Sequence, residues 1–158
     1  MVAILQDIRS LHNVGSIFRT ADAAAVEKLY LCGITPAPLD KFGKVRPQLA
    51  KVSLGAEKTV AWEKCRQTSR LIEKLKESGY KILAIEQSKF SIPYYDVGSN
   101  LKKVALIAGN EIKGLPKEIL KKSDAVLEIP MYGKKESLNV AVAFAIVAFH
   151  LIKITNGE

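Results

Sequence analysis

Cysteine and histidine are scarce in this sequence, which limits the metal and redox chemistry open to it. The 158 residues include two cysteines, Cys32 and Cys65, and two histidines, His12 and His150. Neither cysteine has a CxxC partner or a neighbouring pair of histidines, so the sequence predicts no disulfide framework and no metal site. We interpret both cysteines as small buried hydrophobic residues.

Long apolar runs and targeting segments are also missing. Residues 1–6 lack the basic segment and the long apolar core of a secretory signal. The longest apolar run, Val140 to Phe149, is about half of the ~20 residues that a membrane-spanning helix needs. We therefore expect a cytoplasmic protein without a membrane partner.

Repeats, low-complexity stretches and linkers rich in proline, glycine or serine are absent as well. The composition, 48% hydrophobic and 25% charged, is typical of a globular protein. A chain of 158 residues is long enough for one compact domain and too short for two ordinary ones. We expect a single domain over residues 1–158.

Negative charge is in the minority. With 24 lysine and arginine residues against 16 aspartate and glutamate residues, the formal net charge is +8. A compact basic domain attracts polyanions because it neutralises phosphates and releases counterions, so nucleic acid is the first partner to consider. A general lysine bias of the composition is the alternative, since the lysines are scattered in pairs and form a basic face only if the fold gathers them.

Short apolar runs that alternate with helical patterns indicate the fold class. Strands are predicted over residues 2–5, 28–31, 81–85, 104–108 and 125–129, with a further candidate strand over residues 59–62. Helices are predicted over residues 14–25 and 67–78 from apolar positions three and four apart, over residues 116–122 from the proline at its start, and over residues 138–154. This alternation predicts an α/β fold in which a parallel sheet has helices on both faces.

The last predicted helix differs from the others because residues 140–149 are apolar on every side. A helix on the surface of a monomer keeps a polar face. Either this helix is internal to the subunit, or one side packs within the subunit and the other against a second copy of the chain. For so small a protein we expect the second arrangement, a homodimer.

Three segments place small or polar residues after an apolar strand and ahead of a helix, where open α/β sheets usually bind ligands. The first is residues 13–19 (NVGSIFR) and the second is residues 109–115 (GNEIKGL). The third contains Ile129-Pro130-Met131 and Ser137-Leu138-Asn139-Val140. Neither a Walker A pattern nor a GxGxxG fingerprint is present, so the usual nucleotide-cofactor assignments are excluded.

The residues alone leave several roles open within these segments. Arg19 points away from the apolar stripe of its helix, so it could meet a phosphate or could pair with Asp22 at the surface. Asn13 and Ser137 could each cap a helix. Glu111 could be a surface carboxylate, a helix-capping partner or a functional group.

The histidines and two neighbouring tyrosines give weaker signals. His12 has no serine or cysteine partner at a recognisable spacing and His150 lies in the apolar helix, so we expect structural roles for both. Tyr94 and Tyr95 could stack on a base, although tyrosines beside a turn more commonly pack on the sheet.

In this order and at these separations the three segments resemble the signature motifs of the SpoU (TrmH-type) RNA 2′-O-ribose methyltransferases of the SPOUT superfamily. The resemblance covers almost the whole chain and shows no departure at a key position. It implies a parallel α/β sheet whose C-terminal part forms a trefoil knot, an exception to the rule against threaded loops. It also implies an enzyme that uses S-adenosyl-L-methionine to methylate a ribose 2′-hydroxyl of tRNA or rRNA.

The resemblance also implies roles for particular residues. The implied cofactor-binding residues are Ile85, Gly109, Asn110, Gly114, Ile129, Met131, Ser137 and Leu138. The implied catalytic set is Arg19, Asn13, Glu111, Ser137 and Asn139, and no metal takes part. In the family, Arg19 would assist deprotonation of the hydroxyl or hold the adjacent phosphate from across the dimer interface, because a cation stabilises developing alkoxide charge.

From the resemblance we expect the chain to be the family's catalytic domain without an RNA-binding extension. We therefore expect RNA recognition to come from the domain's own basic surface, from the dimer or from a partner, with Arg19, Lys134 and Lys135 as RNA contacts. A non-catalytic RNA-binding or ribosome-assembly module that keeps the knotted fold is the alternative function. The presence of Arg19, Glu111 and Asn139 favours the enzyme.

Overall fold

A seven-stranded sheet forms the centre of the molecule, and the computed structural model describes residues 1–157. The strands are β1 (Val2–Gln6), β2 (Lys28–Cys32), β3 (Ala61–Cys65), β4 (Lys81–Ile85), β5 (Ile92–Pro93), β6 (Val104–Ala108) and β7 (Ala125–Glu128). They lie in the order β3-β2-β1-β6-β4-β7-β5, and the neighbouring strands pair in parallel. The predicted parallel α/β sheet is confirmed.

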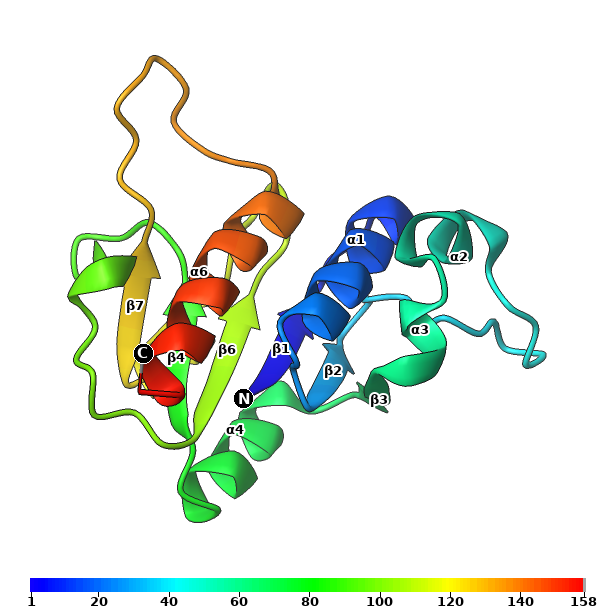
Figure 1. Ribbon diagram of the computed structural model, residues 1–158, viewed down its shortest axis with the longest axis horizontal. Helices are drawn as coiled ribbons and strands as arrows, with labels where there is room; N and C mark the ends of the chain where they lie inside the picture. Colours follow the sequence, from blue (N-terminus) through cyan, green and yellow to red (C-terminus); the bar gives the residue numbers. More distant parts are fainter. Residues whose placement is uncertain (158) are drawn as a thin grey trace.

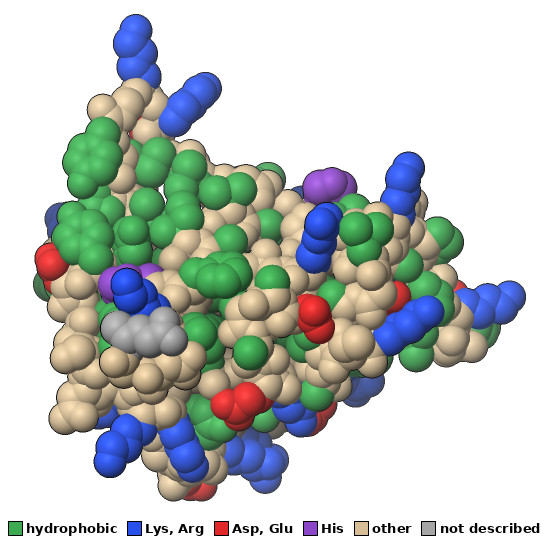
Figure 2. All heavy atoms as spheres, viewed as in Figure 1, with side chains coloured by type: hydrophobic (Ala, Val, Ile, Leu, Met, Phe, Trp, Pro, Cys, Tyr) green, Lys and Arg blue, Asp and Glu red, His purple; other side chains and the backbone are tan. Residues whose placement is uncertain are grey.

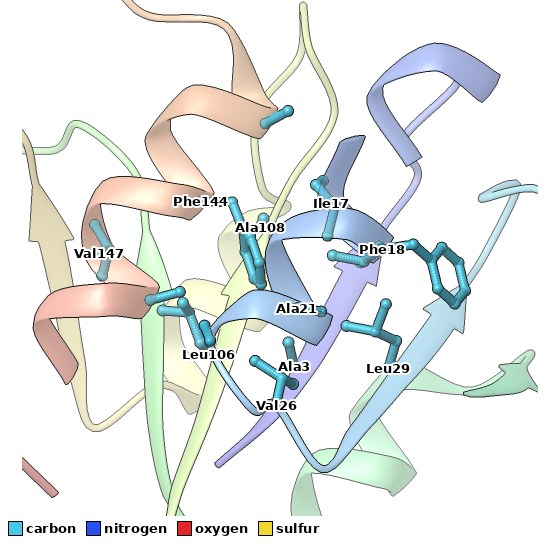
Figure 3. Packing of buried hydrophobic residues seen from close by; sticks show 14 of the residues in the cluster. Ala3, Ile17, Phe18, Ala21, Val26, Leu29, Leu106, Ala108, Phe144 and Val147 are labelled. Carbon is cyan, nitrogen blue, oxygen red and sulfur yellow. The ribbon is translucent and has the colours of Figure 1, made fainter. Parts of the chain in front are cut away.

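Helices cover both faces of this sheet (Figure 1). On one face lie α1 (Leu11–Ala23), α2 (Pro47–Ser53), α3 (Ala56–Thr59) and α6 (Val140–Thr155). On the other lie α4 (Thr68–Glu77) and α5 (Lys117–Lys122), and a short 3-10 turn, η1 (Tyr94–Asp96), follows β5. Because both faces are covered, every residue of β1 and β6 is buried. Figure 3 shows the larger core, in which Phe144 of α6 lies near Leu106 and Ala108 of β6, and Phe18 of α1 lies toward Leu29 of β2.

α1 and α2 approach closely because Gly15 has no side chain. A Cβ at Gly15 would lie 2.7 Å from the backbone oxygen of Leu49 and 3.1 Å from the Cβ of Val52. Separations this small cannot be accommodated unless the two helices move apart. The glycine of the first motif therefore lets α2 pack against the helix that carries Asn13 and Arg19.

α6 is covered on one side only. Phe144, Val147 and Leu151 are fully buried, whereas Val142 and Phe149 are 47% and 50% exposed. The alternative of a helix internal to the subunit is therefore wrong. Figure 2 shows hydrophobic side chains across the part of the surface that α6 occupies. Within residues 1–157, no helix is long and apolar enough to cross a membrane.

α1 and α6 are capped by residues other than those considered from the sequence. α1 starts after Ser10, whose Oγ accepts a hydrogen bond from the backbone N of Asn13 at 3.2 Å. α6 starts after Asn139, whose Oδ1 accepts from the backbone N of Ala141 at 2.9 Å. The capping roles considered for Asn13 and Ser137 are therefore wrong, and the predicted start of the last helix at residue 138 is two residues early.

The region around β3 also differs from the prediction. Residues 56–59 form α3. The strand expected over residues 59–62 therefore begins two residues later, as β3 (Ala61–Cys65). Cys32 and Cys65 are register partners on β2 and β3 and are both free thiols. Burial and the neighbouring thiol raise the pKa of Cys32 to about 12. The interpretation as a buried hydrophobic residue is confirmed for Cys32 and wrong for Cys65, which is half-buried because β3 is an edge strand.

Candidate functional site

A cavity of about 240 Å³ lies at the carboxyl ends of β4, β6 and β7, the edge at which parallel sheets bind their ligands. Its wall combines apolar side chains with the backbone of the loops that follow these strands. All eight residues that the family resemblance implied for the cofactor line it: Ile85, Gly109, Asn110, Gly114, Ile129, Met131, Ser137 and Leu138. The second and third motifs therefore meet around one space.

Glu111 joins the loop after β6 to the start of α1. Its Oε2 accepts a hydrogen bond from the backbone N of Arg9 at 3.1 Å. Its Oε1 accepts from the backbone N of Ser10 at 3.1 Å and from Nδ2 of Asn13 at 3.0 Å. Backbone N–H groups at the start of a helix have no partner within the helix, and a carboxylate there also meets the positive end of the helix dipole. Glu111 therefore fixes α1 beside the cavity.

The protonation of Glu111 follows from the same contacts. Burial alone would raise its pKa, but the hydrogen bonds from Asn13, Arg9 and Ser10 outweigh burial and lower the pKa below the ordinary value of 4.5. Glu111 is therefore an anion at neutral pH and only accepts hydrogen bonds.

Asn13 extends this network to α6. Its Oδ1 accepts a hydrogen bond from Nδ2 of Asn139 at 3.0 Å, while its own Nδ2 donates to Glu111. Asn139 also caps α6. One residue from each motif thus takes part in a continuous chain of hydrogen bonds, which holds α1, the loop after β6 and the start of α6 in one arrangement.

The loop after β6 makes a tight turn around Asn110 and Gly114. The backbone N of Gly114 donates to the carbonyl of Asn110 at 3.0 Å, and Nδ2 of Asn110 donates to the carbonyl of Asp7 at 2.7 Å. Gly114 has a φ of +65°, and a Cβ there would overlap Oε2 of Glu86. The second motif therefore favours glycine at this position because of its conformation, and a Cβ would also displace the Glu86 carboxylate.

Two residues after β4 belong to the site although they were not identified from the sequence. Oε2 of Glu86 accepts from the backbone N of Leu115 at 2.8 Å, and Nε2 of Gln87 donates to the carbonyl of Glu136 at 2.8 Å. Both line the cavity. The signal that could have found them is the one used for the motifs, polar side chains directly after the predicted strand at residues 81–85.

The segment from Ile129 to Asn139 joins β7 to α6 and stands away from the sheet (Figure 1). Ile129, Met131, Ser137 and Leu138 belong to this segment and line the cavity. Its two lysines, Lys134 and Lys135, are exposed between those lining residues, and Figure 2 shows basic side chains projecting from this part of the surface. The lysines expected to contact RNA thus lie on the segment that forms one wall of the cavity.

Arg19 does not line the cavity of its own chain. It lies exposed on α1, six residues beyond Asn13, so it is nearly two helical turns away. The alternative pairing with Asp22 is not formed, because Oδ1 of Asp22 accepts from the hydroxyl of Thr59 at 2.6 Å and Arg19 makes no ion pair within residues 1–157. The guanidinium of Arg19 therefore faces solvent.

The remaining candidates lie outside the cavity. The ring of Tyr94 packs edge-on against Tyr95 and against His150 of α6, with centroid distances of 5.2 and 5.1 Å. His12 is exposed at the start of α1. Over residues 1–157, no group of three or more histidine, cysteine or acidic side chains is placed to hold a metal ion.

Comparison with known proteins is consistent with this geometry. Residues 1–149 match the model of the SpoU rRNA Methylase family. The chain is 31% identical over 149 residues to the tRNA (guanosine(18)-2′-O)-methyltransferase of Aquifex aeolicus, which covers 94% of this chain and 67% of the relative. It is 33% identical over 148 residues to the 23S rRNA (guanosine-2′-O-)-methyltransferase RlmB of Neisseria meningitidis, which covers 93% and 56%. The chain thus spans between 56% and 67% of the length of these two relatives.

Solved structures share the fold. The AdoMet-bound rRNA methyltransferase from Sinorhizobium meliloti matches with a TM-score of 0.82 and 30% identity, over 95% of this chain and 54% of that one. A structure described as giving insights into the 2-OH methylation of C/U34 on tRNA matches with a TM-score of 0.80 and 26% identity. In that case the match covers 99% of this chain and 96% of the other.

Proposed function

The chain belongs to the SpoU methylase family, and from this premise we propose that it transfers a methyl group from S-adenosyl-L-methionine to a ribose 2′-hydroxyl of RNA. One observation carries the proposal: the residues implied for the cofactor surround a single cavity, and Asn13, Glu111 and Asn139 tie its walls together. The family's fold, with its trefoil-knotted C-terminal part, applies to this chain.

The cavity fits S-adenosyl-L-methionine chemically. Ile85, Leu127, Ile129 and Leu138 supply apolar surface for a flat heterocycle. Gly109 lines the cavity, and a Cβ there would lie 2.7 Å from the side chain of Leu115, so the glycine lets the loop after β6 fold back closely beside the ligand. We infer that these residues hold the cofactor, which supplies an electrophilic methyl group when bound.

The other site residues divide into two roles in this proposal. Arg19 binds the substrate, because a guanidinium stabilises negative charge that develops on the attacking ribose oxygen or holds the neighbouring phosphate. Ser137, exposed at the cavity wall, orients the ribose. Asn13, Glu111 and Asn139 are positioning residues, since their polar groups form hydrogen bonds with one another and with the backbone.

The site is complete only in a homodimer in this proposal. Arg19 faces solvent and does not line its own cavity, so Arg19 of the partner subunit is the one that reaches it. The exposed side chains of α6, Val142 and Phe149, supply apolar surface for the contact between subunits. This arrangement gives the expected dimer through the last helix a functional role, because each subunit completes the site of the other.

Between the two RNA classes, we propose tRNA as the substrate. The support is the extent of one match: the structure concerned with C/U34 on tRNA is matched over 96% of its own length and 99% of this chain. Unpaired loops, which folded tRNA contains, are the RNA elements that proteins read most readily.

The test is incubation of the purified protein with methyl-labelled cofactor and, separately, total tRNA and total rRNA, followed by nucleoside analysis. We expect label in a 2′-O-methylated nucleoside from tRNA. Cofactor at a hundred times its dissociation constant should also stabilise the fold by about 2.7 kcal/mol, seen as a higher melting temperature. RNA binding without any labelled nucleoside would favour the non-catalytic module, and label confined to rRNA would overturn the choice of tRNA.

A further inference from the structure

The connection between β2 and α2 contains a small hairpin, residues 38–46, that the catalytic proposal does not use. Leu39 and Val45 form an isolated antiparallel bridge across it. The backbone N of Asp40 donates to the carbonyl of Lys44 at 2.8 Å, and the backbone N of Arg46 donates to the carbonyl of Pro38 at 2.9 Å. The hairpin therefore has a defined shape although it lies outside the sheet.

The tip of this hairpin holds Phe42 out into solvent. Oδ1 of Asp40 accepts hydrogen bonds from the backbone N of Phe42 at 2.8 Å and of Lys44 at 3.0 Å, which fixes the turn. The side chain of Phe42 is 75% exposed. Nζ of Lys41 lies 4.9 Å from the centroid of its ring. An exposed aromatic ring on an ordered turn is a surface on which a planar group can stack.

The hairpin is basic and its cations are not neutralised. It carries Lys41, Lys44 and Arg46 against one acidic residue, Asp40. Within residues 1–157, none of the three cations forms an ion pair, and Nε of Arg46 is buried without a hydrogen-bond partner. Figure 2 shows basic side chains at this end of the molecule. Anions are therefore the groups that complement this surface.

The hairpin is connected to the helix that carries Arg19. It lies between β2 and α2 in the chain and leads directly into α2, and Figure 1 shows it extending outward at the end of the molecule that holds α2 and α3. α2 packs tightly on α1, which carries Arg19, at the contact that Gly15 makes possible. The hairpin is therefore attached, through α2, to the helix that carries Arg19.

We propose that the 38–46 hairpin is an RNA-binding element in which an unpaired base of the substrate stacks on Phe42 while Lys41, Lys44 and Arg46 hold the flanking phosphates. Aromatic stacking with neighbouring cations is how proteins bind single-stranded RNA, since every base has a flat face and every nucleotide a phosphate. This inference rests on the proposed function, because it names how the RNA substrate is held outside the cavity.

The test measures the affinity for total tRNA and, separately, the melting shift with S-adenosyl-L-methionine for four proteins: wild type, Phe42→Ala, Phe42→Leu and Phe42→Trp. Loss of one stacked base weakens binding by about 5- to 150-fold, so we expect this loss for Phe42→Ala and Phe42→Leu. Phe42→Trp should bind like wild type because it keeps a ring. The shift with cofactor should be the same in all four, since the hairpin does not line the cavity.

The charges are tested by Lys41→Ala combined with Lys44→Ala. Two fewer contacts to single-stranded RNA should make the slope of log affinity against log salt shallower by about 1.4. Lys81→Ala combined with Lys102→Ala is the matched control, because these exposed lysines lie at the opposite edge of the sheet and should leave the slope unchanged.

The outcomes separate this inference from the proposed function. Wild-type protein that labels tRNA while Phe42→Ala binds tRNA unchanged would overturn the hairpin inference and leave the proposed function standing; the exposed ring would then suit a protein partner. Phe42→Leu binding as tightly as wild type would overturn stacking. Wild-type protein that neither binds nor labels any RNA would overturn both.

Discussion

Replacing Glu111 with glutamine should destabilise the protein in a pH-dependent way. The carboxylate accepts three hydrogen bonds, from the backbone N of Arg9 and Ser10 and from Nδ2 of Asn13. A glutamine keeps one acceptor oxygen and turns an N–H₂ group toward donors. Hydrogen bonds to a charged acceptor contribute about 1.5–3 kcal/mol each when buried, and Glu111 is mostly exposed. We therefore expect a total loss of about 1–2 kcal/mol, or a fall in melting temperature of roughly 2–8 °C.

The pH dependence follows from the lowered pKa of Glu111 in the folded state. A carboxyl group whose folded pKa lies below its unfolded value stabilises the fold above the unfolded value and loses this contribution as the pH falls through the folded value. The difference in unfolding free energy between wild type and Glu111→Gln should therefore be constant from neutral pH down to about 4.5 and shrink below it.

Urea denaturation at several pH values between 3 and 7 measures this difference directly. Glu136→Gln is the matched control, because its side chain is exposed on the segment between β7 and α6 and accepts no hydrogen bond within residues 1–157. A Glu111→Gln protein as stable as the control at pH 7, or a difference that grows as the pH falls, would refute the role given to the network.

Three further changes test other parts of the account. Gly15→Ala should cost about 1–3 kcal/mol in a thermal melt, because its Cβ would lie 2.7 Å from a backbone oxygen of α2. Val142→Lys should give a folded monomer by light scattering and circular dichroism, because this side chain is 47% exposed within the subunit. Lys134→Glu combined with Lys135→Glu should weaken tRNA binding and leave the cofactor-induced melting shift unchanged, since neither lysine lines the cavity.

For each of these changes, one result would contradict the expected effect. A wild-type melting curve for Gly15→Ala would show that the two helices separate at no cost. A Val142→Lys dimer would place the subunit contact elsewhere, and Phe144→Glu could not replace this test because Phe144 is fully buried within the subunit. Unchanged tRNA affinity after the double lysine reversal would remove those residues from the RNA surface.

The strands could be predicted closely because their signal is local. The runs at residues 81–85 and 104–108 match β4 and β6 to the residue, since apolar residues there are bounded by charge on one side and by polar or glycine residues on the other. α2 was missed because among its seven residues only Leu49 and Ser53 are buried, which leaves no apolar stripe. β5 has two residues and forms only because β7 lies beside it.

The candidate site, like the fold, was predictable from the sequence only in part. The pattern of residues predicted that the motif segments follow strand ends, which share one edge in a parallel sheet, and the family resemblance implied the particular residues that line the cavity. The pattern could not predict that Glu111 accepts a hydrogen bond from Asn13 or that Asn13 bridges to Asn139, since these partners are 98 and 126 residues apart in sequence. The true caps, Ser10 and Asn139, were also hidden, because several polar residues near each helix start are equally suitable from sequence.

The central claim is that a complete site combines the cavity of one subunit with Arg19 of its partner. Arg19→Ala should fold, bind cofactor and lose about a hundredfold or more of its methyl transfer. Ile129→Lys should place a charge in the cavity wall and abolish cofactor binding while keeping Arg19.

The decisive measurement is methyl transfer to tRNA by the two inactive variants after they are unfolded together and refolded as mixed dimers. If Arg19 acts across the interface, each mixed dimer has one intact site, formed by the cavity of the Arg19→Ala subunit and the arginine of the Ile129→Lys subunit, and activity returns. If mixed dimers form and stay inactive, Arg19 acts within its own subunit or not at all, and the account of the site is wrong.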